Sequence, residues 1–599
     1  MLRSLFITFL LNLLIRPSFS RLLTDPSQLL KEGYDFVIVG AGNAGNVIAN
    51  RLASVPAFTV LVIEAGVKLF VSDAGIVSTQ IPFIAPNILL NTSLTWDYVT
   101  VPQEGLNSRI LTYQRGKLLG GSSSINFLIF TRGSRDDFDR WANVTGDSIW
   151  EWDAMFPFAL KARFTTPVDN HNTSQEIVPN FHNTKGPLLT TVNGFPSSID
   201  GKLVATTQAD SEEFPFNPDT NSGNPIGMSW IQSTSGGGSR SSSATAYLHP
   251  ILSHPNLDVL VETQVTRLIN IAEKGGKPDL REVEFAKNAT SHRFTIRAKN
   301  EVILSAGAVN TPQLLLLSGV GPKSELAKFK IPLVVDSPGV GQNLQDHPLL
   351  AQQFLVNSNE TLDDISRNAT LAADVEEQWI TSKTGPFVDV AGNLFSWVRV
   401  GSDIVNKSND PSAGPTSAHV ELFPNEFVSF SEAVPATGSF ISVVNGLVSP
   451  ASRGSITLNS SDPFDFPVID PGFLKNPLDG RILIESVKLA QKMINTSPWD
   501  GFVIQPFGAL ANATTDAEIL EFVRNTVTSF WHPTGTAKMG EQNDPMAVVD
   551  SKLFLKGVQG VRVIDTSIFP FIPAAHLQAP TYAVAERGAS LIQETWAKA

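Results

Sequence analysis

A glycine-rich turn near the N-terminus constrains the fold more than any other feature of this chain. Strand-forming residues at 36–39 lead directly into Gly40, Gly42 and Gly45, and apolar residues then recur at helical spacing over 47–52. This order of strand, tight turn and helix is typical of a βαβ unit that binds a dinucleotide. An unrelated strand–helix unit with a glycine-rich turn is the alternative.

Each glycine has a separate physical role in such a unit. Gly40 permits the tight turn, Gly42 lets the backbone approach a pyrophosphate, and Gly45 allows the helix to pack closely on the strand. The N–H groups at the helix N-terminus then face the phosphates. A second strand over 59–63 ends at Glu64, where a carboxylate can accept hydrogen bonds from ribose hydroxyls. NAD and FAD both carry this ribose, so the turn alone leaves the cofactor open.

Composition excludes several classes of function. The chain has 57 acidic and 44 basic side chains, a net charge of −13, and this balance argues against a nucleic-acid partner. It has no cysteine, so disulfides, thiolate metal sites and a cysteine nucleophile are excluded. Histidines and carboxylates do not cluster at metal-ligand spacing, so we expect no metal. Redox chemistry therefore requires an organic cofactor.

The N-terminus has the pattern of a secretory signal. Arg3 supplies a positive charge, residues 5–15 form a short apolar run, and Ser18 and Ser20 supply small side chains for cleavage. The run is too short to span a bilayer, which takes about 20 residues. We therefore expect residues 1–20 to be removed and the protein to be secreted without a stable membrane span. A retained signal anchor is the alternative.

Ten Asn-x-Ser/Thr sequons support export and predict a glycoprotein with these sites on its surface. A single sequon means little, because the tripeptide is common by chance. The ten asparagines are Asn91, Asn143, Asn172, Asn288, Asn359, Asn368, Asn406, Asn459, Asn495 and Asn512.

A second glycine-rich segment bears on the choice of cofactor. Residues 115–126, RGKLLGGSSSIN, contain two adjacent glycines and three serines, so they expose backbone N–H groups and hydroxyls without bulk. An apolar run at 127–130 follows and anchors the segment. The segment is suited to wrap a pyrophosphate or the edge of a polar ring. A flexible linker is the alternative.

Further motifs follow in a characteristic order. They lie at 115–126 together with TRGS at 131–134, at 307–322, at 341–348 and at 531–540. With this set the chain resembles the glucose-methanol-choline (GMC) oxidoreductase family, from about Tyr34 to the C-terminus. The first two segments resemble the two signatures of the family, whose members bind FAD.

The resemblance implies an α/β fold in two parts. A doubly wound, Rossmann-like FAD-binding domain is interleaved with an α+β substrate domain built on an antiparallel sheet. We predict that the FAD-binding domain is discontinuous and comprises mainly 34–190, 225–348 and 535–599. Residues 191–224 and 349–534 are then mainly the substrate domain. We expect a monomer.

The resemblance also places residues around the cofactor. Val265 would meet the adenine through its backbone, and 126–128 would lie beside the isoalloxazine. Some members carry a histidine at the position of Ile125 that attaches the flavin covalently; isoleucine has no nucleophilic atom, so we expect non-covalent FAD. The predicted cofactor-binding residues are Gly40, Gly42, Asn43, Ala44, Gly45, Glu64, Arg115, Leu119, Gly120, Ser122, Ser123, Asn126, Phe127, Leu128, Val265, Asp565 and Gln578.

Two of the nine histidines stand in unusual contexts. His532 lies in His-Pro-Thr-Gly-Thr and His576 in Ala-His-Leu-Gln, and a strand-like stretch at 560–565 separates them, so turns can bring both to one cavity. Alcohol oxidation needs a base for the hydroxyl proton, which suits imidazole, and a partner that steadies the developing alkoxide. By the resemblance, His532 is the general base and His576 its partner. His347 is interpreted as a loop-shaping residue near the cofactor.

Aromatic residues flank the histidine pair and favour flat, apolar alcohols. We predict that Phe127 and Trp531 line the substrate pocket, and we interpret Phe130 and Phe530 as core. The chain looks most like the aryl-alcohol oxidase branch and its pyranose dehydrogenase relatives. It departs from the former at Phe127 and Trp531, where Tyr and Phe are frequent, so a larger aromatic or terpenoid alcohol is an alternative.

The sequence thus predicts a secreted FAD-dependent oxidoreductase that converts an alcohol to a carbonyl compound and passes electrons to dioxygen or a quinone. Sugar dehydrogenation is one alternative. A hydroxynitrile lyase with non-redox FAD is another on the same fold. An NAD-linked dehydrogenase would not need the serine-rich loop, and a cofactor-free binding protein is the least supported alternative.

Overall fold

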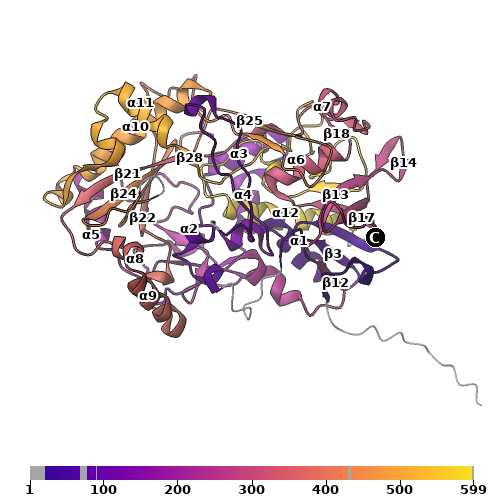
Figure 1. Cartoon of the computed structure of the whole chain (residues 1–599), viewed down its shortest axis with the longest axis horizontal. Helices are drawn as coiled ribbons and strands as arrows, with labels where there is room; N and C mark the ends of the chain where they lie inside the picture. Colours follow the sequence, from indigo (N-terminus) through magenta and orange to yellow (C-terminus); the bar gives the residue numbers. More distant parts are fainter. Residues whose placement is uncertain (1–20, 68–76, 90, 430–432, 597–599) are drawn as a thin grey trace, which may run out of the picture.

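The computed structural model describes residues 21–67, 77–89, 91–429 and 433–596. The predicted signal peptide, residues 1–20, lies outside the described residues. Two large sheets lie on opposite sides of the molecule in Figure 1, each with its own helices. Within the described ranges, no helix combines the length and the apolar character needed to cross a membrane.

The first sheet has eight strands with a parallel centre. In spatial order they are β1 (Arg21–Leu23), β12 (Leu257–Leu260), β3 (Val60–Ile63), β2 (Tyr34–Val39), β17 (Phe294–Leu304), β16 (Glu282–Ala286) and β13 (Gln264–Ile269), with β29 (Val561–Val563) also beside β17. The strands from β1 to β17, together with β29, pair in parallel, and β16 and β13 add an antiparallel edge. This order confirms the predicted doubly wound α/β unit.

The glycine-rich turn joins β2 to helix α1 (Asn43–Ala53) as predicted. Gly40 has a φ of 99°, and a Cβ there would lie 2.5 Å from the carbonyl oxygen of Ser305. A Cβ on Gly45 would lie 1.9 Å from the carbonyl oxygen of Gly40. Glycine is therefore required at both positions, and α1 packs closely on the sheet and against α12 (Gln578–Trp596).

The second sheet has seven strands and is antiparallel. Its order is β27 (Val503–Phe507), β21 (Pro348–Val356), β24 (Ser439–Leu447), β23 (Val420–Asn425), β22 (Leu394–Val398) and β8 (Gly227–Trp230), with β28 (Thr528–Ser529) also beside β21. Helices α10 (Pro477–Ile494) and α11 (Asp516–Thr526) accompany it (Figure 1). Val443 belongs to the core with these helices, whereas Val444 lines a cavity, because successive side chains of a strand point to opposite faces.

The two sheets are interleaved along the chain. β8 lies in the second sheet, although the predicted ranges assign 225–348 mainly to the FAD-binding domain. β29 returns the chain to the first sheet after the last strand of the second. The exact division into domains stays a prediction, while the structure shows that segments far apart in sequence form each sheet.

Candidate active site

A long cavity lies between the two units and contacts residues from both. Glu64 and Val265 line one part of it, and Gly42 and the first residues of α1 line it as well. His532 and His576 line the part beside the second sheet. The cavity therefore connects the predicted dinucleotide turn with the predicted catalytic pair.

The Glu64 carboxylate is held in place by backbone groups. Its Oε2 accepts from the N–H of Ala41 at 2.7 Å, and its Oε1 accepts from the N–H of Gly66 at 2.7 Å. Burial raises the pKa of Glu64, while these two hydrogen bonds lower it. A carboxylate has about four acceptor positions, so the side chain still has capacity for ribose hydroxyls.

Two helix N-termini face the middle of the cavity. One is that of α1, and the other is that of α6 (Gly307–Leu317). Asp565 organises the second by accepting from the N–H of Gly307 at 2.9 Å and from the hydroxyl of Thr311 at 2.7 Å. Free N–H groups and the positive ends of two helix dipoles suit an anionic pyrophosphate.

The serine-rich loop meets the glycine-rich turn backbone to backbone. Gly120 and Gly121 have φ values of 91° and 52°, and a Cβ on Gly121 would lie 2.8 Å from the Cα of Gly42. This close approach leaves a smooth cradle without side chains between the two loops. The cradle, the two helix N-termini and Glu64 together fit FAD.

Most of the predicted cofactor-binding residues line the cavity, but four do not. Ser123 is buried behind it, where its hydroxyl donates to the carbonyl of Gly120 at 2.6 Å. Leu119 is fully buried, and Gly45 packs α1 on the turn. The lining set is Gly40, Gly42, Asn43, Ala44, Glu64, Arg115, Ser122, Asn126, Phe127, Leu128, Val265, Asp565 and Gln578, and the supporting set is Gly45, Leu119, Gly120 and Ser123.

The structure brings His532 and His576 together. Their ring centroids are 5.1 Å apart and the rings are perpendicular, at 89°. The backbone N–H of His532 donates to Oδ1 of Asp346 at 2.8 Å, and that of His576 donates to the hydroxyl of Thr131 at 2.7 Å. Buried acceptors therefore position the backbone of both histidines.

A third histidine and a glutamate complete the cluster. Nδ1 of His347 lies 3.0 Å from Nδ1 of His532, and Nε2 of His576 lies 2.9 Å from Oε1 of Glu421 on β23. Burial lowers the pKa of His532 well below its usual range, and it lowers the pKa of His347 to about 3. Positive charge on His576 acts in the same direction on both rings. His532 is therefore neutral near pH 7.

Aromatic side chains form the walls beside the histidines. The rings of Phe127 and Trp531 are stacked with centroids 6.0 Å apart, and Nε1 of Trp531 donates to Oε1 of Gln114 at 3.1 Å. Phe530 packs against a buried core cluster, as our interpretation holds, and it also stacks on His532 at 5.2 Å and lines the cavity. Phe130 is buried and is not part of the lining.

The comparison with protein families decides the classification. A family model of the N-terminal part of GMC oxidoreductases matches residues 34–349, and one of the C-terminal part matches residues 450–585. The chain belongs to the GMC oxidoreductase family. It is an FAD-dependent oxidoreductase that acts on alcohols.

Curated and solved relatives agree with this classification. Pyranose dehydrogenase 3 of Leucoagaricus meleagris is 37% identical over 584 residues, which cover 94% of this chain and 93% of the relative. Formate oxidase of Aspergillus oryzae, studied for its FAD modification, matches with a TM-score of 0.85 and 29% identity over 94% of this chain and 99% of that one. A fungal aryl-alcohol oxidase matches with a TM-score of 0.80 and 28% identity over 95% of this chain and all of that one.

Sequence reasoning missed three residues of this GMC oxidoreductase site. His347 contacts His532 directly, Glu421 pairs with His576, and the buried Arg240 donates to Oδ1 of Asn126 at 2.7 Å. Burial lowers the pKa of Arg240 to about 9. One feature of the sequence could have identified Glu421. It is a carboxylate inside the apolar, strand-forming run at 420–425, and a buried carboxylate requires a partner.

Proposed function

We propose that this GMC oxidoreductase oxidises an aromatic or other apolar alcohol to a carbonyl compound, with His532 as the general base and His576 as its hydrogen-bonding partner. The observation that supports the proposal is the different environment of the two rings. His576 pairs with the buried carboxylate of Glu421, whereas His532 lies among the rings of His347, Phe530 and His576, and burial keeps it neutral.

His532 and His576 have different roles in the proton transfer. Nε2 of His576 lies 2.9 Å from Oε1 of Glu421, and this contact holds the ring where it can hydrogen-bond the substrate oxygen. Burial lowers the pKa of His532 well below its usual range, so its ring keeps a lone pair and accepts the hydroxyl proton. FAD supplies the hydride acceptor when it is bound. His576 is buried and His532 is half-buried, and this setting limits the access of competing water to the proton transfer.

Replacement of His532 tests the assignment. His532→Ala should retain FAD and its visible spectrum, and it should slow anaerobic flavin reduction by at least about 100-fold, because a general base contributes that much. Stopped-flow absorbance measures the rate. His254→Ala is the control, since His254 contacts the carbonyl of Ala53 away from the cavity. A variant that keeps its reduction rate would refute the role of His532.

The opposite assignment makes a distinct prediction. A carboxylate can also orient a neutral imidazole as the base, in which case His576 would accept the proton. Glu421→Gln and His576→Ala would then slow reduction more than His532→Ala does. Under our proposal the order is reversed, and His532→Ala slows reduction most.

The cavity walls support an apolar substrate. Phe127, Trp531, Phe530, Phe423 and Leu349 line it near the histidines, and a polyhydroxylated sugar would leave hydroxyls unpaired against such walls. Stacked aromatic rings contribute about 0.5–1.5 kcal/mol beyond area burial.

Sugar oxidation is the second candidate, because a pyranose dehydrogenase is 37% identical to this chain. Anaerobic mixing of the enzyme with aromatic alcohols and with pyranoses separates the two. Bleaching of the flavin by aromatic alcohols at lower concentration supports our proposal, and bleaching by sugars alone contradicts it. Parallel assays with dioxygen and a quinone then identify the electron acceptor.

We further propose secretion as a glycoprotein. All ten sequon asparagines are exposed, from Asn91 to Asn512, so each is accessible to glycosylation. Expression in a secreting host, followed by treatment with an endoglycosidase, should give protein in the medium whose mass falls on treatment. Intracellular, unglycosylated protein from the same host would contradict this proposal.

A further inference from the structure

A cleft that contains three arginines lies apart from the catalytic cavity. Arg140 comes from helix α3 (Arg135–Thr145), Arg453 follows β24 in the chain, and Arg481 lies on α10. Phe571, from the segment after β29, also lines the cleft. Segments from both halves of the molecule therefore meet around these three positive charges.

The guanidinium groups converge on one aromatic ring. The Cζ atoms of Arg140 and Arg453 lie 4.1 and 5.9 Å from the ring centroid of Phe571. Burial, together with the charge of Arg140, lowers the pKa of Arg453 to about 10. Two cations that repel each other in a half-buried setting favour a negative charge between them.

These arginines bind backbone oxygens rather than carboxylates. Nη1 of Arg140 donates to the carbonyl of Pro411 at 3.0 Å, and Nη1 of Arg453 donates to the carbonyls of Pro450 and Ser452. Across the part of the chain that the structure describes, none of the three arginines has a carboxylate oxygen within 4.0 Å. Nε of Arg140 is buried and has no hydrogen-bond partner.

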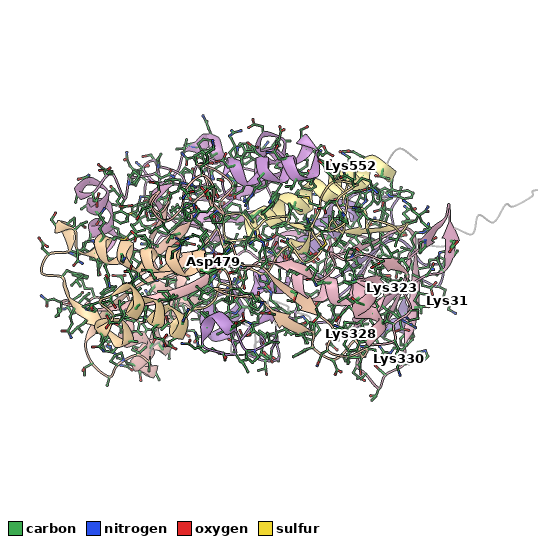
Figure 2. All side chains as sticks on the ribbon, turned by 90° about the horizontal axis from the view of Figure 1, so that it is seen from above. Lys31, Lys323, Lys328, Lys330, Asp479 and Lys552 are labelled. Atoms are coloured by element: carbon green, nitrogen blue, oxygen red, sulfur yellow. The ribbon has the colours of Figure 1, made fainter. Side chains whose placement is uncertain are left out.

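Three acidic groups act on these arginines, and all are already engaged. Asp137, whose charge acts on Arg140, accepts from the N–H and the hydroxyl of Ser134 at 2.9 and 2.8 Å, and Asp410 itself lines the cleft. Asp410 binds Nη2 of Arg399 at 2.5 Å and Nε2 of His419 at 3.0 Å. Asp479, labelled in Figure 2, accepts from the N–H groups of Ala451 and Ser452 at 2.8 and 3.0 Å, and its charge offsets part of that of Arg453. The cleft keeps an excess of positive charge.

A helix terminus adds to this charge. Helix α10 has 18 residues, and Asn476 caps it by accepting from the N–H of Leu478 at 3.0 Å. Both residues line the cleft, so the positive end of the helix dipole points toward the same space as the arginines.

We propose that this cleft binds a tetrahedral oxyanion, a phosphate or sulfate group, between Arg140, Arg453 and Arg481. Guanidinium groups bind such oxygens through paired, charge-assisted hydrogen bonds, and the free N–H of Arg140 and the start of α10 supply further positive potential. The group is either a free ion or a substituent of a larger molecule.

Calorimetric titration of the FAD-loaded enzyme tests the proposal, because bound FAD keeps the pyrophosphate cradle filled. Inorganic phosphate and sulfate, titrated at constant ionic strength against a chloride reference, should bind saturably with one site. Arg453→Gln should weaken binding by at least about 10-fold, since a charge-assisted contact is lost. Arg163→Gln, an exposed arginine outside the cleft, removes the same charge and should leave the affinity unchanged.

Two outcomes would overturn the proposal: no saturable binding beyond that of chloride, or equal affinity in Arg453→Gln and the unmodified chain. Arg481 is exposed, so Arg481→Gln serves as a second variant if Arg453→Gln does not fold, and it should also weaken binding. A parallel titration with a glucose sulfate shows whether the cleft binds the free ion or a substituent of a larger molecule. Tighter binding than inorganic sulfate assigns the group to a larger molecule, and weaker binding assigns the cleft to the free ion.

Discussion

At the scale of single residues, the tautomers of two histidines are linked. Nδ1 of His347 and Nδ1 of His532 are 3.0 Å apart, so one of them donates a proton to the other. If His532 donates, its Nε2 keeps a free lone pair, which is the form that a general base needs. His347 is completely buried, and we expect it to be the acceptor that selects this tautomer.

The buried His347 predicts a pH dependence of stability. Its pKa falls from 6.5 to about 3 on folding, so the unfolded chain binds a proton that the folded chain does not. This contribution of His347 to the free energy of unfolding is fully present above pH 6.5. It is lost as the pH falls toward 3, by at most about 1.36 kcal/mol per pH unit. His347→Gln, which cannot titrate, should lose this part of the slope.

Urea unfolding at pH 7 and pH 4.5 measures the effect. The carboxylates are the same in both proteins, so the difference between the two slopes reports His347 together with its effect on the adjacent His532. Equal slopes in the variant and the unmodified chain would show that burial does not hold His347 neutral.

At the scale of elements, the contact between β2 and α1 depends on a single missing methyl group. Gly45→Ala would place a Cβ 1.9 Å from the carbonyl oxygen of Gly40, so α1 must move away from the turn. We expect a loss of about 1–3 kcal/mol in stability, as for other overpacked sites, together with weaker retention of FAD. Thermal unfolding and the flavin absorbance of purified protein measure both.

A glycine in an open position provides the control. Gly201 lies in α5 (Asp200–Ala209), and a Cβ there would meet nothing within 4 Å. Gly201→Ala should raise stability by about 0.5–1 kcal/mol, because alanine loses less conformational freedom in a helix. Equal melting temperatures for the two variants would show that the close approach at Gly45 does not exclude a Cβ at this position.

At the scale of the whole molecule, the cavity that fits FAD lies between two units that the chain crosses repeatedly. Ile125 lines the cavity and has no nucleophilic atom, so we expect FAD to be held without a covalent bond. Acid precipitation should therefore release yellow flavin into the supernatant. Added FAD at about 100 times its Kd should stabilise the protein by about 2.7 kcal/mol. Flavin that stays in the pellet would contradict this prediction.

Local sequence patterns were sufficient to predict the dinucleotide-binding turn. The spacing of Gly40, Gly42 and Gly45, the strand before them and the helix after them depend on neighbouring residues only, so the sequence predicted β2, α1 and β3 with small errors at their ends. The position of Glu64 followed in the same way, because it ends a strand next to β2.

The partners of the two proposed catalytic histidines were decided by the tertiary structure alone. His347 and His532 are 185 residues apart, and Glu421 and His576 are 155 apart, so no local spacing relates them. They meet because one face of the second sheet packs over the cavity of the first unit. The sequence thus predicted the residues of the FAD cradle and the two histidines, and the structure brings them to one cavity. Packing determined which imidazole is beside a carboxylate and which stays neutral, because pKa depends on burial and on charges close in space.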